Sequence, residues 1–370
     1  MSNRRKLILL ILQWIVLWWL SYALEQYDII VGVYGRHLYP LLQTLRHCVL
    51  GLVPISVGDV LYFVAGVWVL VTVVKWGRYL YRWKEDKAKL AGSVLGALNV
   101  WLLVYLMFLV GWGAHYSRPP LARVWGLEPP HYNNADERKQ ALKKSLSSYT
   151  QLLAAKLNEH APLYTRMSMA EINDSAVAYY RQYTNSSVKG YGLGIKPSMY
   201  GGLMQRMGVD GYFNPFTGEG QVTRQLPEFM MPFTLCHEMA HQAGIAAEGD
   251  ANLLAYALST TTTNATFRYS AYLNLWLYAS RRLYYMDSNA AKTLAATLPQ
   301  LTKAHIDTLE LLSKEYHGLL TSYSGTIYDN YLRAQNQQDG IRSYGNVTYE
   351  AMLLEEQRGK RGVERRIEVE

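Results

Sequence analysis

The residues best suited to chemistry lie in the segment 236–244, which reads CHEMAHQAG and contains the spacing HExxH. Residues four apart share one face of a helix, so the imidazoles of His237 and His241 could bind one metal ion. Glu238 is displaced from His237 by about 100° around the helix, which places it beside the metal. Two neutral nitrogens, a neighbouring carboxylate and an open metal position indicate a zinc hydrolase, with Glu238 polarising a water molecule.

The flanking residues argue against the alternative, an exposed helix face that carries two His and one Glu by chance. With 9 His in 370 residues, a chance HExxH has a probability on the order of 1%. Pro227 and Pro232 can each lie in the first turn of a helix. Gly244 follows His241 by three residues, where a helix commonly ends. The sequence therefore predicts a short helix that ends close to the motif.

A third ligand is expected from the next carboxylates, Glu248 and Asp250. On a continuous helix, Glu248 would lie about 10 Å beyond His241 along the axis. A chain break at Gly244, with a second helix starting near Glu248, would bring this side chain back to the metal. Asn252 would then share its face and could orient a ligand, whereas Asp250 would point elsewhere. The alternative role of both acids is compensation of the helix dipole.

The residues from Gly211 to Leu258 resemble a bacterial family of membrane-bound, gluzincin-like zinc metallopeptidases of the DUF3810 type. The resemblance extends to the N-terminal apolar segments and covers most of the chain. It implies that His237, His241 and Glu248 bind zinc and that Glu238 is the catalytic base. The family usually has a second Glu where this chain has Asp250, so Asp250 is the fallback ligand. The matching segments are GYFNPFTGEGQV, PFTLCHEMAHQAGIAAEGDAN, FRYSAYL and YLRAQNQQDGIRSYG.

Two other protease classes fit the sequence poorly. The metzincin pattern HExxHxxGxxH requires a third His where this chain has Ala247. An intramembrane protease would hold HExxH within a membrane span, but the apolar run FMMPFTLC beside the motif is far too short.

Three long apolar stretches near the N-terminus predict membrane-spanning helices at about 7–24, 58–78 and 91–113. Each can cross about 30 Å of hydrocarbon, the second with the help of its flanking residues. A cleaved signal peptide is the alternative for the first stretch. A membrane anchor is favoured, because no small-residue cleavage site follows and the stretch carries three Trp. A buried core helix is the alternative for all three, and it suits the third least, since that stretch is apolar on every face.

The distribution of Lys and Arg predicts the orientation. Nine lie before the first span and between the second and third, against four in the other two flanking segments. Positive residues accumulate on the cytoplasmic side, so the N-terminus should be cytoplasmic. We therefore expect a membrane domain at 1–114 and an extracytoplasmic domain at 115–370. The family resemblance places them in the inner membrane and periplasm of a bacterium.

The expected fold class is mainly α, with three transmembrane helices followed by an α-rich, zincin-like α+β domain that contains a small sheet. A capping box at Ser168–Glu171 should open one helix. Strands are expected in the segments 191–204 and 211–226, which are interrupted by Gly and Pro. Further helices are expected at 136–160, 266–286, 288–322 and 325–337.

Two further features of a peptidase site are expected, and the sequence leaves both open. An edge strand that pairs with extended substrate would lie just before the HExxH helix, although a structural hairpin is an equally good interpretation. Its residues would be Asn214, Pro215, Phe216, Thr217 and Gly218. A side chain that stabilises the oxyanion is also required. The family resemblance suggests Tyr344 and Tyr331, followed by Arg342 and Arg268; spacing does not select among them, and a role as a core Tyr is the favoured alternative for both tyrosines.

Composition excludes several other classes. The net charge of +8 comes largely from the predicted cytoplasmic segments, and no basic-aromatic RNA motif is present, so we expect no nucleic-acid partner. Cys48 and Cys236 give no disulfide framework, and Cys236 is expected to pack as a small core residue. The expected partners are one Zn²⁺ ion, the lipid bilayer and a peptide or protein substrate, and no protein partner is indicated.

Together these features predict a membrane-anchored, zinc-dependent metallopeptidase. The alternative is a non-enzymatic membrane scaffold or sensor with a structural zinc site. A structural site needs the ligands but not Glu238, and is usually closed by a fourth protein ligand.

Overall fold

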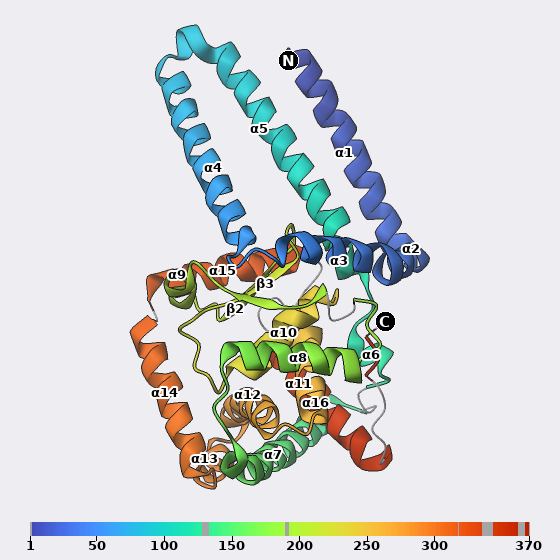
Figure 1. Cartoon of the computed structure of the whole chain (residues 1–370), viewed down its shortest axis with the longest axis vertical. Coiled ribbons are helices and arrows are strands. Elements are labelled where there is room, and N and C mark those ends of the chain that lie inside the picture. Colours follow the sequence, from blue (N-terminus) through green and yellow to red (C-terminus); the bar gives the residue numbers. More distant parts are fainter. Residues whose placement is uncertain are drawn as a thin grey trace.

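The computed structural model describes residues 2–127, 133–188, 192–316, 318–334, 343–361 and 367–369. As predicted, the described chain is mainly helical, with one small sheet (Figure 1). Arg342 lies outside the described residues, as do the side chains of Tyr331 and Tyr344, so these three candidates are not placed.

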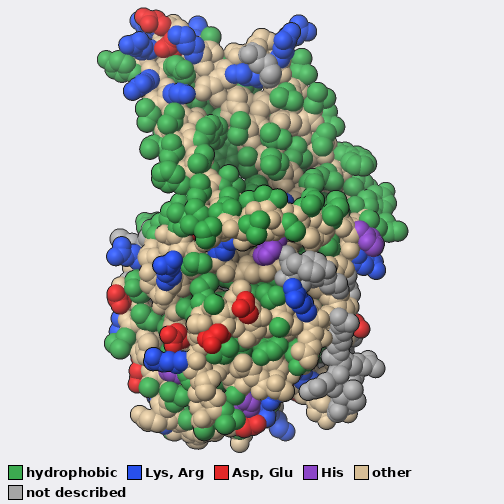
Figure 2. Space-filling model, in the orientation of Figure 1, with side chains coloured by type: hydrophobic (Ala, Val, Ile, Leu, Met, Phe, Trp, Pro, Cys, Tyr) green, Lys and Arg blue, Asp and Glu red, His purple; other side chains and the backbone are tan. Residues whose placement is uncertain are grey.

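Three helices are long and apolar enough to cross a membrane. They are α1 (Asn3–Gln26), α4 (Val57–Tyr81) and α5 (Trp83–Gly111). The first two extend beyond their predicted bounds at both ends, whereas the third starts eight residues before position 91 and ends two residues before position 113. The N-terminus and the α4–α5 connection lie at one end of these helices, and the globular part lies at the other (Figure 1). Apolar side chains cover the helices between the two ends, and Lys and Arg gather at the end away from the globular part (Figure 2). This arrangement fits a membrane protein.

Short helices join these apolar helices to the globular part. Between α1 and α4 the chain forms α2 (Asp28–Val33), the π-helical η1 (Tyr34–Leu38) and α3 (Tyr39–Leu50). These elements run across the base of the long helices, at a steep angle to them (Figure 1). After α5 come η2 (Gly113–Ser117) and α6 (Leu121–Val124).

The sheet has three strands in the order β1-β3-β2. Strand β1 (Ile195–Pro197) pairs parallel with β3 (Glu219–Val222), and β2 (Gly211–Asn214) pairs antiparallel with β3. The helix α9 (Gly201–Arg206) lies between β1 and β2 in sequence. Because β3 is the central strand, only β1 and β2 present an edge.

The predicted edge strand at 214–218 is wrong in its position. Asn214 ends β2, and Pro215 to Gly218 form the turn to β3. The Asn214 side chain accepts hydrogen bonds from the backbone amides of Phe216 and Thr217, at 3.0 and 3.1 Å. The φ of +69° at Gly218 closes the turn. Asn and Gly favour this geometry, since a short polar side chain can bond to the backbone and Gly tolerates a positive φ.

The core forms around two helices that follow the sheet, α10 (Met231–Gln242) and α11 (Glu248–Thr261). Leu253, Leu254 and Leu258 of α11 are fully buried, and each contributes about 1.5–3 kcal/mol on burial. Helix α11 packs between α10, α12 and α16, and α12 also packs along α7. The surrounding helices are α7 (Ala135–His160), α8 (Met169–Tyr183), α12 (Ala265–Met286) and α16 (Ser343–Arg361), with the short η3 (Ala161–Leu163) after α7.

Most predicted helices are found, with one clear error. The capping box at Ser168 and Glu171 opens α8, with the Ser168 amide 2.7 Å from the Glu171 carboxylate. The predicted helix 288–322 is instead divided into α13 (Ser288–Ala296), α14 (Gln300–Tyr316) and the start of α15 (Leu319–Ala334). Pro299 accounts for the first break, because proline has no N–H and disfavours helical conformation in the residue before it.

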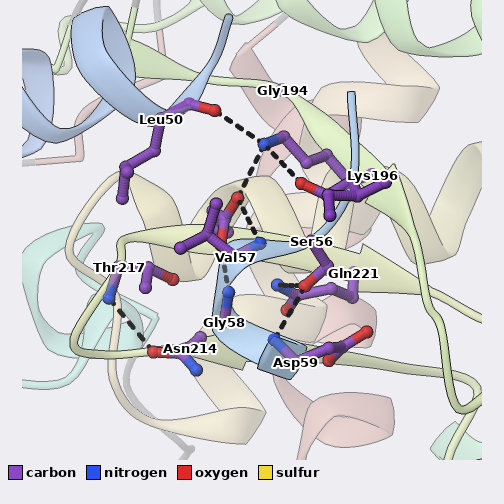
Figure 3. Close-up of polar contacts among 12 residues, drawn as sticks. Leu50, Ser56, Val57, Gly58, Asp59, Gly194, Lys196, Asn214, Thr217 and Gln221 are labelled. Carbon is purple, nitrogen blue, oxygen red and sulfur yellow. Dashed lines mark hydrogen bonds and ion pairs between the residues drawn. The ribbon is translucent and has the colours of Figure 1, made fainter. Parts of the chain in front are cut away.

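The N-terminus of α4 is fixed to the sheet by a buried ionic network (Figure 3). The Glu219 carboxylate accepts hydrogen bonds from the amides of Val57 and Gly58, at 3.3 and 2.6 Å. Lys196 lies 2.7 Å from the same carboxylate and donates to the carbonyls of Leu50 and Ile55. The network therefore provides hydrogen-bond acceptors for the first amides of α4, and the charges of Lys196 and Glu219 compensate each other.

A second set of contacts holds the next residues of α4. The Asp59 carboxylate accepts from the Tyr212 hydroxyl at 2.6 Å and from the Met199 amide at 2.7 Å. Ser56 caps the helix by accepting from the Asp59 amide, and its hydroxyl lies 2.9 Å from the Gln221 side chain (Figure 3). An apolar helix and all three strands are thus joined as one unit.

Candidate metal centre

The HExxH residues lie in the second half of α10, and the helix ends where predicted. Pro232 is in its first turn. At the other end Gly244 adopts a φ of +87°, and the Ile245 amide donates to the Ala240 carbonyl at 3.0 Å. This left-handed glycine ends the helix, and the chain reverses before α11 starts at Glu248. The predicted break and the predicted second helix are both confirmed.

The reversal brings three side chains together. The Nε2 atoms of His237 and His241 lie 3.2 Å apart. Oε2 of Glu248 lies 3.2 Å from the first nitrogen and 3.6 Å from the second. The two imidazole rings are nearly perpendicular, at 89°. All three residues are buried, so their polar atoms converge on a space largely removed from water.

The hydrogen bonding of His241 prepares its Nε2 for a metal. Its Nδ1 lies 2.7 Å from the carbonyl oxygen of Ile245. A proton on Nδ1 donates to that carbonyl and leaves a lone pair on Nε2, as is usual for a histidine ligand. The Nδ1 of His237 is buried and has no hydrogen-bond partner among the described residues.

The cluster is also electrostatically tuned. Burial raises the pKa of Glu248, but the imidazoles of His241 and His237 outweigh it and hold this pKa well below its usual range. Burial lowers the pKa of His241, whereas the Glu248 carboxylate raises it, with a net value of about 9. Without a metal, the charges of this pair thus compensate each other inside the protein. A cation bound between them would replace the proton on the imidazole.

Glu238 lies beside this cluster and is packed against the sheet. A Cβ at Gly211 would come within 2.5 Å of its Oε1 atom, so only glycine fits there. Its Oε2 atom is buried without a hydrogen-bond partner among the described residues. Burial raises the pKa of Glu238 to about 7, although the nearby imidazoles of His237 and His241 lower it. A carboxyl with a pKa near neutrality can both take up and release a proton.

The structure separates the other two predicted residues from the ligand cluster. Asp250 points toward α6, where its carboxyl accepts a hydrogen bond from the Leu121 amide, and burial raises its pKa to about 6. Asn252 is buried one turn after Glu248, as predicted, but its Nδ2 has no hydrogen-bond partner among the described residues. The fallback ligand is therefore not part of the cluster, and the expected orienting contact from the Asn252 amide is not formed.

Tyr278 of α12 is a candidate for oxyanion stabilisation that the sequence did not indicate. Burial, with the nearby charges of Asp210 and Glu248, raises the pKa of its hydroxyl to about 12. The hydroxyl therefore stays protonated, and the charge of the candidate ligand Glu248 contributes to this shift in its pKa. Among 30 Tyr in the chain, no spacing distinguishes it. Arg268, one of the predicted candidates, instead donates to the Thr262 carbonyl at the end of α11.

The end of α10 is held by residues from the apolar helices and their connections. The Tyr39 hydroxyl of α3 donates to the carbonyls of His241 and Gln242, at 3.4 and 2.9 Å. The indole of Trp112, directly after α5, donates to the His241 carbonyl at 3.3 Å. Arg118 donates to the Gly244 carbonyl at 3.1 Å. These donors satisfy carbonyls that have no partner within the helix.

The donor set fits zinc. Two imidazole nitrogens and one carboxylate oxygen are ligands that Zn²⁺ accepts, and three protein ligands leave one tetrahedral position open. The three candidate ligand atoms all lie within 4.8 Å of one another, which is close enough for one cation to contact all of them.

The chain belongs to the family described as "Protein of unknown function (DUF3810)", whose model matches residues 34–351. Comparisons with curated proteins and with solved structures gave no match.

Proposed function

We propose that this protein is a membrane-anchored, zinc-dependent metallopeptidase. The observation that supports it most is the convergence of His237, His241 and Glu248, with the buried Glu238 on the same helix as the two His. Hydrolysis needs a general base as well as metal ligands. Glu238 can fill this role, and its carboxyl fits against the sheet because residue 211 is a glycine without a side chain. The alternative, a structural zinc site, gives no role to a buried carboxyl with an unpaired oxygen.

The two His and Glu248 would hold the ion. Zinc bound there would polarise a scissile carbonyl and increase the acidity of a water molecule. Glu238 would take a proton from the water that attacks the carbonyl carbon, and would later give this proton to the leaving amine. A pKa near 7 serves both transfers.

We assign to Tyr278 the role of donating a hydrogen bond to the carbonyl oxygen as negative charge develops on it. Its hydroxyl remains a donor at all physiological pH values because its pKa is about 12. Donors aimed at an oxyanion in a buried site commonly contribute about 10²–10³ in rate.

Metal analysis and cleavage profiling of membranes test this function. His237→Ala and His241→Ala should lose stoichiometric zinc, whereas Glu238→Gln should keep it and lose turnover. Glu310→Gln, an exposed substitution of the same type on α14, is the matched control and should behave as wild type. Zinc retained by both His variants, or identical cleavage profiles for wild type and Glu238→Gln, would contradict the proposal.

We also propose that the globular part lies outside the cytoplasm, in the periplasm if the host has two membranes. The excess of Lys and Arg, nine against four, supports a cytoplasmic N-terminus. A reporter that is active only outside the cytoplasm should be active when fused after Tyr116 and silent when fused at Lys84. The reverse pattern would place the candidate site in the cytoplasm.

A further inference from the structure

The connection between α1 and α4 carries an apolar face that no described part of the protein covers. Leu41, Leu45 and Val49 of α3 are 58%, 55% and 67% exposed, and their four-residue spacing puts them on one face. Exposed apolar residues continue this surface on both sides, at Ile29, Val33, Leu38, Leu52 and Ile55. A soluble surface rarely presents so long an apolar run.

The opposite face of α3 is polar and buried in the globular part. Tyr39 holds the end of α10, and the Gln43 amide donates to the carbonyls of Gly192 and Gly218, at 2.9 and 2.8 Å. One face of α3 therefore packs on the globular part, and the opposite, exposed face is suited to contact an apolar environment outside the protein. Since α1, α4 and α5 leave the globular part at the same level (Figure 1), that environment is the surface layer of the bilayer.

This arrangement brings the candidate metal centre close to the membrane. The Tyr39 hydroxyl lies 3.4 Å from the carbonyl oxygen of the ligand His241. Helix α3 is about 10–12 Å wide, so the ligand cluster lies about 20 Å, two helix diameters, from its apolar face. An extended chain covers that distance with about six residues.

Strand β2 leads from the candidate base toward the membrane. Gly211, at its start, contacts Glu238. Phe213 packs against Trp112 at the end of α5, with ring centroids 5.1 Å apart. Asn214, at its end, contacts Gly58 at the start of α4. A chain aligned with β2 would therefore run between the bilayer and the catalytic carboxyl.

The outer edge of β2 is suited to bind such a chain. The Thr223 amide donates to the Asp210 carbonyl at 2.8 Å, and Tyr212 lies opposite Gln221 in the ladder. Alternate residues of an antiparallel strand point their main-chain groups to opposite sides. The N–H and C=O groups of Gly211 and Phe213 are thus directed away from β3, where they can pair with an extended peptide.

We infer that α3 lies in the bilayer surface and that the substrates are juxtamembrane segments of membrane-anchored proteins or peptides, bound along the edge of β2. The substrate class rests on the proposed peptidase function, whereas the position of α3 does not.

The position of α3 can be tested with a native residue. Cys48 is exposed on this helix and Cys236 is buried, so a thiol-reactive environment-sensitive fluorophore should label Cys48 of the full chain selectively. In phosphatidylcholine vesicles, its emission should shift to the blue and be quenched by spin-labelled lipid. A Cys48→Ser/Leu311→Cys variant is the control, because Leu311 is 66% exposed on α14, a helix that runs along the side of the globular part and not across the base of the long helices (Figure 1). Equal exposure of both probes to water would overturn the inference.

The substrate class is tested with mixed-sequence peptides linked to a membrane anchor. Peptides joined through a spacer of about six residues should be cleaved at least ~10-fold faster than the same peptides without an anchor, or with a spacer of about 20 residues. Equal rates for all three would overturn the inference and leave the peptidase function standing. Absence of cleavage of any peptide, together with identical membrane profiles for wild type and Glu238→Gln, would overturn both.

Discussion

Two buried clusters of charged and polar groups in this protein differ in how completely their atoms are paired by hydrogen bonds and ion pairs. In the network of Lys196 and Glu219, each charge meets its partner and further backbone groups, at distances of 2.6 to 3.3 Å. In the cluster of His237, His241 and Glu248, imidazole nitrogens and a carboxylate oxygen face one another. Both clusters join segments that are distant in sequence or separated by a chain reversal.

The difference separates a structural role from a chemical one. A closed network of paired charges fixes the position of α4 on the sheet and has no atom left to bind anything else. At the open cluster, Oε2 of Glu238 and Nδ1 of His237 are buried and have no hydrogen-bond partner in the described part of the chain. Unsatisfied buried groups are costly, and in the proposed peptidase the Glu238 carboxyl would find its partner in the attacking water. Substitutions in the two clusters should therefore have different consequences.

The largest effect is expected from Glu248→Ala, which should release zinc and remove activity. Asp250→Ala, two residues away, should retain zinc and cost about 1 kcal/mol of stability or less, because Asp250 faces α6 instead of the cluster. Zinc titration of both variants beside thermal melts checks this. If Asp250→Ala releases the ion and Glu248→Ala keeps it, the third ligand has been assigned incorrectly.

In the closed network, Glu219→Ala should lower the free energy of unfolding by about 3–5 kcal/mol, because it leaves the Lys196 charge buried and unpaired. The zinc content of the folded fraction should not change. Glu159→Ala breaks the exposed pair with Lys156 and is the matched control, with an expected cost below about 1 kcal/mol. Denaturant unfolding in detergent measures both, and equal costs would remove the distinction between a buried network and a surface ion pair.

At the open cluster, Tyr278→Phe should lower kcat by about 10² while zinc binding stays intact, since the hydroxyl is assigned to the transition state and not to the metal. Tyr284→Phe, on the exposed side of the same helix, is the control and should leave kcat unchanged. Steady-state kinetics with zinc analysis distinguish the two. A loss of zinc in Tyr278→Phe would indicate that this residue supports the ligands instead.

The smallest effect is a pH dependence away from both clusters, at a largely buried carboxyl on α16. Burial, with the charge of Asp250, raises the pKa of Glu350 on α16 to about 7, against about 4.3 in an unfolded chain. The folded state holds this proton more tightly, so the contribution of Glu350 to stability is full below about pH 4 and is lost as the pH rises through 7.

Glu350→Gln should therefore stabilise the protein at pH 8 by about 1 kcal/mol or more, and the gain should shrink toward pH 4. Thermal melts across this range check the trend, with the exposed Glu310→Gln as a control that shows no such change. A gain that is constant with pH would mean that the carboxyl of Glu350 does not titrate as described.

The local features of the candidate site were readable from the sequence because they depend on nearby residues. HExxH spacing, Pro232 and Gly244 define a short helix with two His on one face, and they correctly predicted the reversal and the start of α11 at Glu248. The capping box at Ser168 and the apolar helices α1, α4 and α5 are local in the same sense.

Tertiary structure decided what depends on pairing between distant segments. The segment that contains Asn214 reads as a strand, but only its pairing with β3 shows that it turns there and that β2 is the edge. Tyr278 and Tyr39 approach the site through packing over long sequence distances, and nothing in their own neighbourhoods marks them among 30 Tyr. The helical period and the turn residues determined which side chains form the candidate ligand cluster, because they act over a few residues. The global packing of helices and sheet determined the space around Glu238 and which residues from distant segments surround it.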